Sequence, residues 1–423
     1  MTFGFLIAAT ASGVEPCYGW TFPTVVEGDR VSVEYDKAIT NETIAQRILD
    51  ATESAWTTYE GLGFLPPVGA PAFSLEADPL GRGGFAVTEL CDGMHHAKLF
   101  VYEGSLNNKS GRPVAVHELF HAVQYAYDPQ MPYVEHFARW PWWAEGTATW
   151  AEAQAQANPR SHLGALANHL ELGHLALHQD VTALVDPQRS DFLYSTAMLA
   201  FTLEAREGAR AIADTFNIAA QTPGERAWFP DVVEDLDIDF DALWADHLRR
   251  LPTVDHTFGS DLGVRPDPVS TIQEVPGTAG ADPDRPPQGL GWAIHRLQPS
   301  NVAEGDPIEV SFTGASDARW HVVVVTANRI RAGASSTLAF DARTDGDAPI
   351  THTLNYQNPM WIVVSPEADD TDGFDYTVSL KATAEGPAEA CGCTTGPSGT
   401  AFGLLLIVGV VVRRTPHRGA PHG

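Results

Sequence analysis

The sequence is poor in cysteine and in basic residues. Its 423 residues include only four cysteines, which excludes a zinc framework built on cysteine ligands. Lysine and arginine together number 26 against 54 aspartates and glutamates, so the formal net charge is −28. Because this charge repels phosphate backbones, we expect no nucleic-acid partner. Such acidity is typical of a solvated surface in salty or extracellular surroundings.

Long apolar runs are also scarce, and each end of the chain carries a short one. The apolar residues 3–9 lead into an A-x-A pattern at Ala9 and Ala11, which predicts a partial signal peptide over residues 1–19 without a basic start. A buried first strand is the alternative. Residues 401–412 are apolar or glycine, and this run is shorter than the roughly 20 residues that span a bilayer as a helix.

The cysteines fall into two pairs. Cys17 and Cys91 lie in the part of the chain expected to be globular, where a disulfide between them and two free thiols are both open interpretations for an exported protein. Cys391 and Cys393 precede the second apolar run, which ends in two arginines. Residues 385–423 therefore resemble the MYXO-CTERM-type sorting tails of surface proteins of some Gram-negative bacteria. The resemblance implies export, anchoring near these cysteines and a place outside the cell or on its outer surface.

The patterning between the two ends predicts an α+β fold. Strands are expected at residues 31–35 and 98–103, and helices at residues 42–59, from 114 onward, and at 143–157, 192–207 and 240–251. Proline, glycine and aspartate accumulate over residues 255–288, which indicates a linker. Short β runs follow at residues 292–297, 308–313, 321–326 and 361–365. We therefore expect a catalytic domain over residues 20–254 and a β-sandwich over residues 289–384.

The end of the expected β-sandwich carries two further signals. The run GFDYTVSLKA at residues 373–382 resembles the final strands of bacterial pre-peptidase C-terminal domains, whose role is accessory. An acidic turn comes just before or within it, and its members are Asp369, Asp370, Asp372 and Asp375. Carboxylate oxygens can bind calcium, but a solvated hairpin turn is the favoured interpretation.

The segment VAVHELFHAVQYAYD carries the strongest chemical signal. It places His117, Glu118 and His121 in an H-E-x-x-H motif. On a helix, residues four apart point in directions that differ by about 40°, so both imidazoles can reach one metal ion with Glu118 beside them. Catalytic zinc needs a third protein ligand, and Glu145, separated from His121 by 23 intervening residues, is the candidate.

The surroundings of Glu145, WWAEGTATWAE, resemble those of the glutamate ligand in the membrane alanyl aminopeptidase and leukotriene-hydrolase type of gluzincin. The positions that match the W-x-x-E-G-x-x-x-x-x-E pattern are Trp142, Glu145, Gly146 and Glu152. HELFHAV resembles the thermolysin side of the same clan at least as closely. The resemblance implies a zincin-like domain with a mixed lobe and a helical lobe, zinc as the cofactor, and Glu152 in support of the ligands.

The same family places a tyrosine before a helix, where its hydroxyl stabilises the oxyanion. Tyr194 in YSTAMLAF stands at that place, although Thr196 and Ala197 replace the family's lysine and glycine, and a packed helix tyrosine is the alternative. Zinc lowers the pKa of water toward about 7, so Glu118 is expected to act as general base and to pass the proton to the leaving amine.

The cleavage mode is predicted from what precedes the zinc helix. No G-A-M-E-N-like segment, whose glutamate fixes a free amino terminus, is present there. Residues 98–106, including Tyr102 and Glu103, are expected to lie along an edge strand and to pair with an extended substrate. The sequence therefore predicts a secreted or surface-anchored zinc endopeptidase that acts on peptides or proteins. An aminopeptidase and a surface-displayed binding protein with a degenerate protease lobe are the alternatives.

Overall fold

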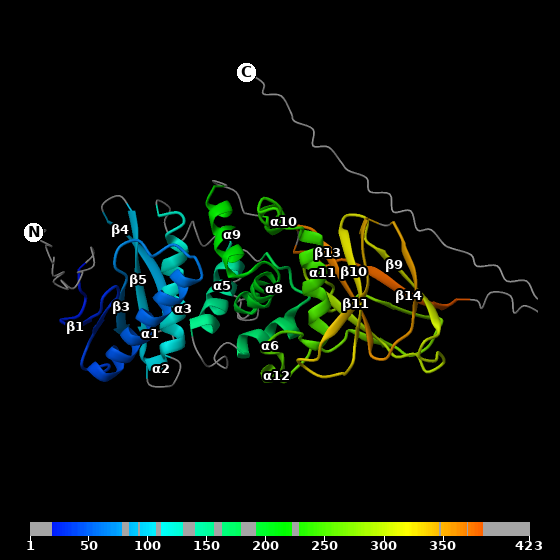
Figure 1. Cartoon of the computed structure of the whole chain (residues 1–423), viewed down its shortest axis with the longest axis horizontal. Helices are drawn as coiled ribbons and strands as arrows, with labels where there is room; N and C mark the ends of the chain where they lie inside the picture. Colours follow the sequence, from blue (N-terminus) through cyan, green and yellow to red (C-terminus); the bar gives the residue numbers. More distant parts are fainter. Residues whose placement is uncertain are drawn as a thin grey trace, which may run out of the picture. The chain divides into compact units, whose positions relative to one another are not determined.

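The fold is α+β (Figure 1). The structure, a computed structural model, describes residues 19–77, 84–91, 94–106, 111–129, 140–155, 163–178, 192–221, 228–346, 348–369 and 371–383. Within these residues the strands form three β-sheets. The sorting tail, residues 1–18 of the expected signal peptide, Cys17 and Asp370 lie outside the described residues.

The first sheet has the strand order β1-β2-β3-β5-β4. Its strands are β1 Thr24–Glu27, β2 Ser32–Tyr35, β3 Ala72–Glu76, β4 Gly84–Cys91 and β5 Met94–Tyr102. β2, β3 and β5 run parallel, whereas β1 and β4 are antiparallel to their neighbours. β4 is therefore an edge strand of this sheet, and β5 is paired on both sides.

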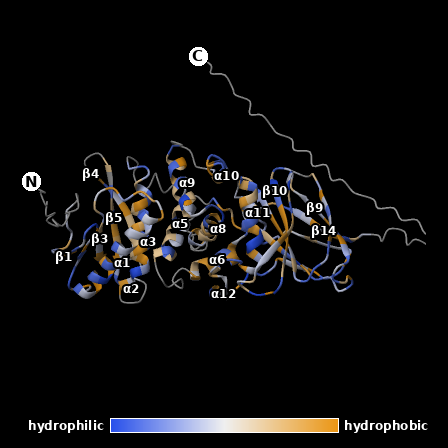
Figure 2. Ribbon diagram, in the orientation of Figure 1, coloured by the Kyte–Doolittle hydropathy of each residue, from blue (hydrophilic) through white to orange (hydrophobic). Residues whose placement is uncertain are grey.

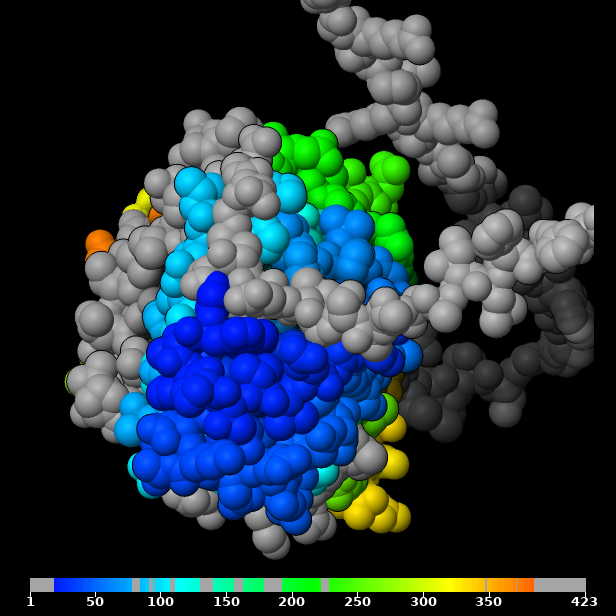
Figure 3. Space-filling model, turned by 90° about the vertical axis from the view of Figure 1, so that its left-hand side faces the viewer, coloured from blue at the N-terminus to red at the C-terminus, as the bar shows by residue number. Residues whose placement is uncertain are grey.

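Helix α1 (Glu42–Gly61) covers this sheet through an amphipathic face. The side chain of Asn41 caps the helix by accepting a hydrogen bond of 3.2 Å from the backbone N–H of Ile44. The buried residues recur at helical spacing, among them Ala45, Ile48 and Leu49, and they face β2 and α3 (Gly111–Tyr125). In Figure 3 the blue residues of β1, β2 and α1 form the lower part of the face turned to the viewer.

Two neighbouring helices are buried over most of their length, at residues 115–125 of the first and 141–152 of the second. They are α3 and α5 (Pro141–Ala155), and they contact each other. A helix that is surrounded by protein needs no polar face. Accordingly, neither helix is divided into a polar side and an apolar side. Figure 2 shows the hydrophobic residues gathered on these helices and on the neighbouring strands. The expected helices at residues 114 onward and 143–157 are confirmed with their starts shifted by two or three residues.

The other helices form the middle of the described chain. They are α2 Glu103–Leu106, α6 Leu163–Leu172, α8 Ala197–Glu207, α9 Ala209–Gln221, α10 Phe229–Glu234, α11 Phe240–Arg250, the 3₁₀ helix η2 Leu251–Thr253 and α12 Gly259–Leu262. α5 contacts α8, and α8 contacts α9 and α11. No helix within the described residues is apolar over a length sufficient to cross a membrane.

Two further sheets follow, with strand orders β11-β10-β13-β8-β6 and β12-β9-β14-β7. Their strands are β6 Ser270–Ile272, β7 Gly277–Gly280, β8 Ala293–Leu297, β9 Pro307–Gly314, β10 Arg319–Ala327, β11 Ser336–Asp345, β12 Ile350–Asn355, β13 Met360–Glu367 and β14 Tyr376–Ala382. All pairs are antiparallel except β6 with β8. Both sheets contribute to one hydrophobic cluster.

The strands β10 and β13 are buried on both faces because they separate two hydrophobic clusters. In β10, Val322 and Val324 belong to the cluster shared by the last two sheets. Val323 and Val325 point to the opposite face and join the larger cluster of the first sheet and the helices. Helix α11 contacts β10, β11 and β13 on that second side. The unbroken apolar runs of these strands follow from this double burial.

The prediction of a linker over residues 255–288 is wrong. This stretch holds α12, β6 and β7, and it is joined to the sheets because β6 pairs with β8 and β7 pairs with β14. Asp255 accepts hydrogen bonds from Arg249 and from Ser336 of β11. Proline, glycine and aspartate here build the turns between short strands, and the same composition is found in linkers.

Candidate metal centre

The H-E-x-x-H motif lies within the buried helix α3. His117 and Glu118 are each 7% exposed, and His121 is 3% exposed. The helix contacts β4 and β5 on one side and α5 on the other, so the two imidazoles face a second element instead of solvent. The ring centroids of the two histidines are 4.9 Å apart. The helical spacing thus places both rings on one face of the helix, as predicted.

Helix α5 brings Glu145 to that face. Its neighbour Gly146 permits a close approach to the start of α8, because a Cβ atom at this position would collide with the hydroxyl oxygen of Thr196. Thr196 donates a hydrogen bond of 2.7 Å to the backbone carbonyl of Trp142, which ties the two segments together. The glycine of the W-x-x-E-G segment therefore has a local structural reason.

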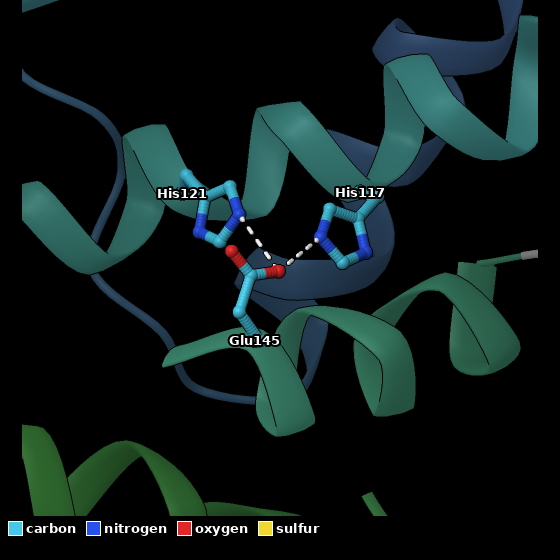
Figure 4. Close-up of side chains that lie close together, drawn as sticks. All are labelled: His117, His121 and Glu145. Atoms are coloured by element: carbon cyan, nitrogen blue, oxygen red, sulfur yellow. Dashed lines mark hydrogen bonds and ion pairs between the residues drawn. The ribbon is translucent and has the colours of Figure 1, made fainter. Parts of the chain in front are cut away.

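The three candidate ligands converge on one point (Figure 4). The Oε2 atom of Glu145 is 3.0 Å from Nε2 of His117 and 3.7 Å from Nε2 of His121. Ligands about 2.0–2.1 Å from a tetrahedral zinc ion lie about 3.3 Å from one another. The two distances lie on either side of this value, so the donor atoms fit a zinc ion with little movement.

Pairing between the imidazoles and the carboxylate of Glu145 dominates the electrostatics of the site. Burial alone would lower the pKa of the His121 imidazole, but the carboxylate of Glu145 outweighs it and raises this pKa to about 9. Burial likewise opposes ionisation of Glu145, and the charge of His121 lowers its pKa to about 2. Within the described residues, Glu145 pairs with imidazoles only.

No protein-family model matches this chain, and no curated protein does. We therefore infer the chemistry of the site from its side chains.

The expected base, Glu118, is buried next to the ligands. Burial raises the pKa of its carboxyl to about 7, although the nearby His121 and His117 act to lower it. Strand β4 passes close by, since a Cβ atom on Gly84 would lie 2.7 Å from Oε1 of Glu118. A carboxyl whose pKa is near neutrality can both accept and return a proton.

Two further predicted residues lie near the ligands. The ring centroid of Tyr194, which is partly buried just before α8, is 5.7 Å from that of His117. Glu152, about two helical turns beyond Glu145 on α5, has a carboxylate oxygen 4.0 Å from Nδ1 of His117. The structure thus gathers residues from α3, α5 and the start of α8.

The predicted substrate strand needs a correction. β5 is not an edge strand, because it pairs with β3 through one side and with β4 through the other. Tyr102 is buried at its end, and Glu103 is exposed at the start of α2. The pattern of residues 98–103 could not show this, because a strand's neighbours in the sheet are not encoded in its own alternation.

The sequence analysis did not predict that Gln124 belongs to the site, where it contacts His121. The Nδ1 atom of His121 lies 2.8 Å from Oε1 of Gln124. The available signal was its position three residues after His121, on the same helix face.

A second group of acids and a histidine meets the same geometric criterion. Its members are Asp241, His321 and Glu367. Arg343 bonds both carboxylates, and its Nη2 atom is 2.8 Å from Oε2 of Glu367. Arg319 also pairs with Glu367, at 3.3 Å. Since guanidinium groups already supply the positive charge, this group is an ion-pair network that joins α11 to the strands.

Proposed function

We propose that this chain is a zinc peptidase that cleaves within peptide chains, with a zincin-like part and an accessory β-sandwich. One observation carries the proposal. The ligand atoms of His117, His121 and Glu145 all lie within 4.8 Å of one another, beside the buried carboxyl of Glu118. A cluster with a purely structural role could consist of His117, His121 and Glu145 alone. It would not require the buried carboxyl of Glu118.

The donor set favours zinc over the hard cations. Two imidazole nitrogens and one carboxylate are typical ligands of catalytic zinc, whereas calcium and magnesium prefer oxygen ligands throughout. When bound, zinc supplies a Lewis acid that activates water and polarises a scissile carbonyl. His117 and His121 would hold the ion through their Nε2 atoms, and Glu145 would neutralise part of its charge.

The remaining residues move protons and stabilise charge. Glu118 takes a proton from the attacking water and passes it to the nitrogen of the leaving amine, for which its pKa of about 7 is suited. Tyr194 donates from its hydroxyl to the oxygen of the former carbonyl, and its ring lies 5.7 Å from that of His117. Both steps use side chains that border the cluster of ligands.

The edge strand β4 provides the surface for an extended substrate. Within the described part of the sheet β4 is the last strand in the order and pairs with β5, and we place the substrate beside its start, next to the candidate base. Gly84, at its start, lets the strand pack against α3 next to the base, since a Cβ atom there would collide with Val114 and with Glu118. A peptide that lies along β4 and continues beyond the start of the strand would pass the catalytic residues, and such a path favours internal cleavage.

The compartment remains part of the proposal. The signals that predict export and surface anchoring lie outside the described residues. A secreted or surface-bound enzyme would meet proteins or peptides from outside the cell as substrates, and its net charge of −28 suits such surroundings.

Cleavage of an unbiased peptide library by the purified protein, with and without a chelator, tests this function. We expect internal cuts that stop when metal is removed and return when zinc is added. The metal content is measured on the same sample. Protein that holds zinc and leaves the whole library intact would favour the binding-protein alternative, and cleavage that resists the chelator would exclude a metallopeptidase.

A further inference from the structure

Gln124 is a buried amide between the two helices that carry the metal ligands. Its side chain is in α3, and the residue is 1% exposed. It reaches His121 on its own helix and two groups on α5, namely the backbone carbonyl of Ala144 at 2.8 Å and the hydroxyl of Thr147 at 3.0 Å. Figure 4 shows how closely these two helices face each other around Glu145.

The partners on α5 determine the orientation of this amide. A carbonyl oxygen only accepts hydrogen bonds, so the group of Gln124 that faces Ala144 must be the NH₂. The hydroxyl of Thr147 donates its proton to the backbone carbonyl of Trp143, at 2.6 Å. It can therefore only accept from Gln124, and the donor is the same NH₂. Both amide protons are thus donated to α5, and the amide oxygen is left for His121.

The orientation of the amide then determines the tautomer of His121. The amide oxygen accepts, so Nδ1 of His121 must carry the proton and donate it over 2.8 Å. In the neutral ring this leaves the lone pair on Nε2, which lies 3.7 Å from Oε2 of Glu145. Such a ring has its metal-binding nitrogen already directed at the third ligand.

The same side chain also holds the third ligand in place. Ala144 immediately precedes Glu145, and Thr147 follows two positions later. Two hydrogen bonds from Gln124 therefore attach the ligand-bearing turn of α5 to α3. His117 has a weaker equivalent, because its Nδ1 atom is 4.0 Å from the carboxylate of Glu152.

We propose that Gln124 is the positioning residue of the metal centre, which selects the tautomer of His121 and fixes the spacing between His121 and Glu145. The inference rests on the proposed metal site, but it does not depend on the substrate or on cleavage. Loss of such a partner of a ligating histidine lowers metal affinity by about 10- to 100-fold.

Zinc affinity of the full chain, measured by competition with a chromophoric chelator, tests the proposal. Gln124→Met removes every hydrogen bond at nearly constant shape and should weaken zinc binding about 10- to 100-fold. Gln124→Glu still accepts from Nδ1 of His121 but cannot donate to α5. It should therefore bind zinc more tightly than Gln124→Met, while its melting temperature in the absence of metal falls below that of the wild type.

Gln154→Met is the matched control. Gln154 lies on α5 and donates to Glu204 at 3.1 Å, away from the ligands, so its loss should leave zinc affinity unchanged. Cobalt-loaded samples give a second reading, since a reoriented His121 should alter the visible absorption of Gln124→Met and leave that of Gln154→Met as in the wild type.

The outcomes separate this proposal from the proposed function. Wild-type affinity in folded Gln124→Met, or equal affinities of the Met and Glu variants, would overturn the positioning role, as would a wild-type chain that binds no zinc. If the wild type binds zinc and cleaves no peptide, the proposed function fails, and the order of affinities still decides the role of Gln124.

Discussion

Two clusters of acids and histidines in this molecule satisfy the same distance criterion, and they differ in what neutralises them. In the first, His117, His121 and Glu145 surround a point that no arginine or lysine reaches within the described residues. In the second, Arg343 bonds Asp241 and Glu367 directly. Proximity of ligand atoms is thus insufficient, because a carboxylate already paired with a guanidinium offers little to a metal ion.

The difference extends to the neighbours of each cluster. Glu118 lies next to the first with its pKa raised to about 7 by burial. The second is surrounded by side chains that pair with one another, including His321, whose Nε2 atom is 2.9 Å from Glu367. A reactive centre keeps a group whose proton can move, whereas a structural network uses all of its charges internally.

The largest expected effect is that of Glu118→Gln. This change preserves shape and leaves the three ligands in place, but it removes the base. Peptide hydrolysis should fall by at least about 100-fold while zinc content stays at the wild-type level. Steady-state kinetics and metal analysis of one preparation measure both quantities. Zinc-loaded Glu118→Gln with wild-type turnover would show that another group acts as base.

Glu145→Ala and Glu367→Ala compare the two clusters directly. Glu145→Ala should lose both zinc and activity, since two imidazoles alone bind the ion weakly. Glu367→Ala should keep its zinc but lose about 3 kcal/mol in the free energy of unfolding, because Arg343 and His321 lose the carboxylate that they share. Metal analysis and urea unfolding measure these effects. The opposite pattern, with zinc lost from Glu367→Ala, would reverse the two roles.

The buried His169 has no acidic partner among the described residues. Burial lowers the pKa of His169 to about 3, and His169 stacks on Phe192. The unfolded chain, with a pKa near 6.5, takes up this proton first, so stability is complete above pH 6.5 and falls as the pH decreases toward 3.

His169→Phe should therefore reduce the pH dependence of the unfolding free energy by about 1.4 kcal/mol per pH unit between pH 6 and pH 4. Phe192→Leu is the control, since it loses the stacked ring but keeps the histidine. Urea unfolding at several pH values measures both variants. Equal slopes for the wild type and His169→Phe would contradict a neutral buried His169.

The sequence alone predicted which candidate ligands lie together better than it predicted their surroundings. His117, His121 and Glu145 could be found because helical spacing and a flanking pattern are local properties, and the structure brings them together. The edge strand could not, because a strand's place in the sheet depends on its pairing, and the pattern of residues 98–103 does not show that β5 is paired on both sides. The linker over residues 255–288 was misjudged for a similar reason, since turn residues serve both linkers and short strands.

The contacts of Gln124 could be predicted from the sequence only in part. Its contact with His121 follows from helical spacing, but its contacts with Ala144 and Thr147 depend on how α5 packs against α3. The same holds for Thr196, which departs from the family pattern in sequence and yet bonds the carbonyl of Trp142 in the fold.

The smallest expected effect concerns Glu103. It is exposed at the start of α2, so Glu103→Ala should change kcat/KM by no more than about twofold. Peptides with free and acetylated amino termini should be cleaved equally well, because binding along β4 needs no terminal ammonium. Loss of cleavage on acetylation, reproduced by Glu103→Ala, would instead identify an aminopeptidase.

The two clusters can be compared most directly by anomalous diffraction at the zinc edge, from crystals of the protein supplied with zinc. We expect a single strong peak between Nε2 of His117, Nε2 of His121 and the carboxylate of Glu145, with none beside Asp241 and Glu367. An anomalous peak at the second cluster, or no peak at the first, would contradict the assignment of the metal centre.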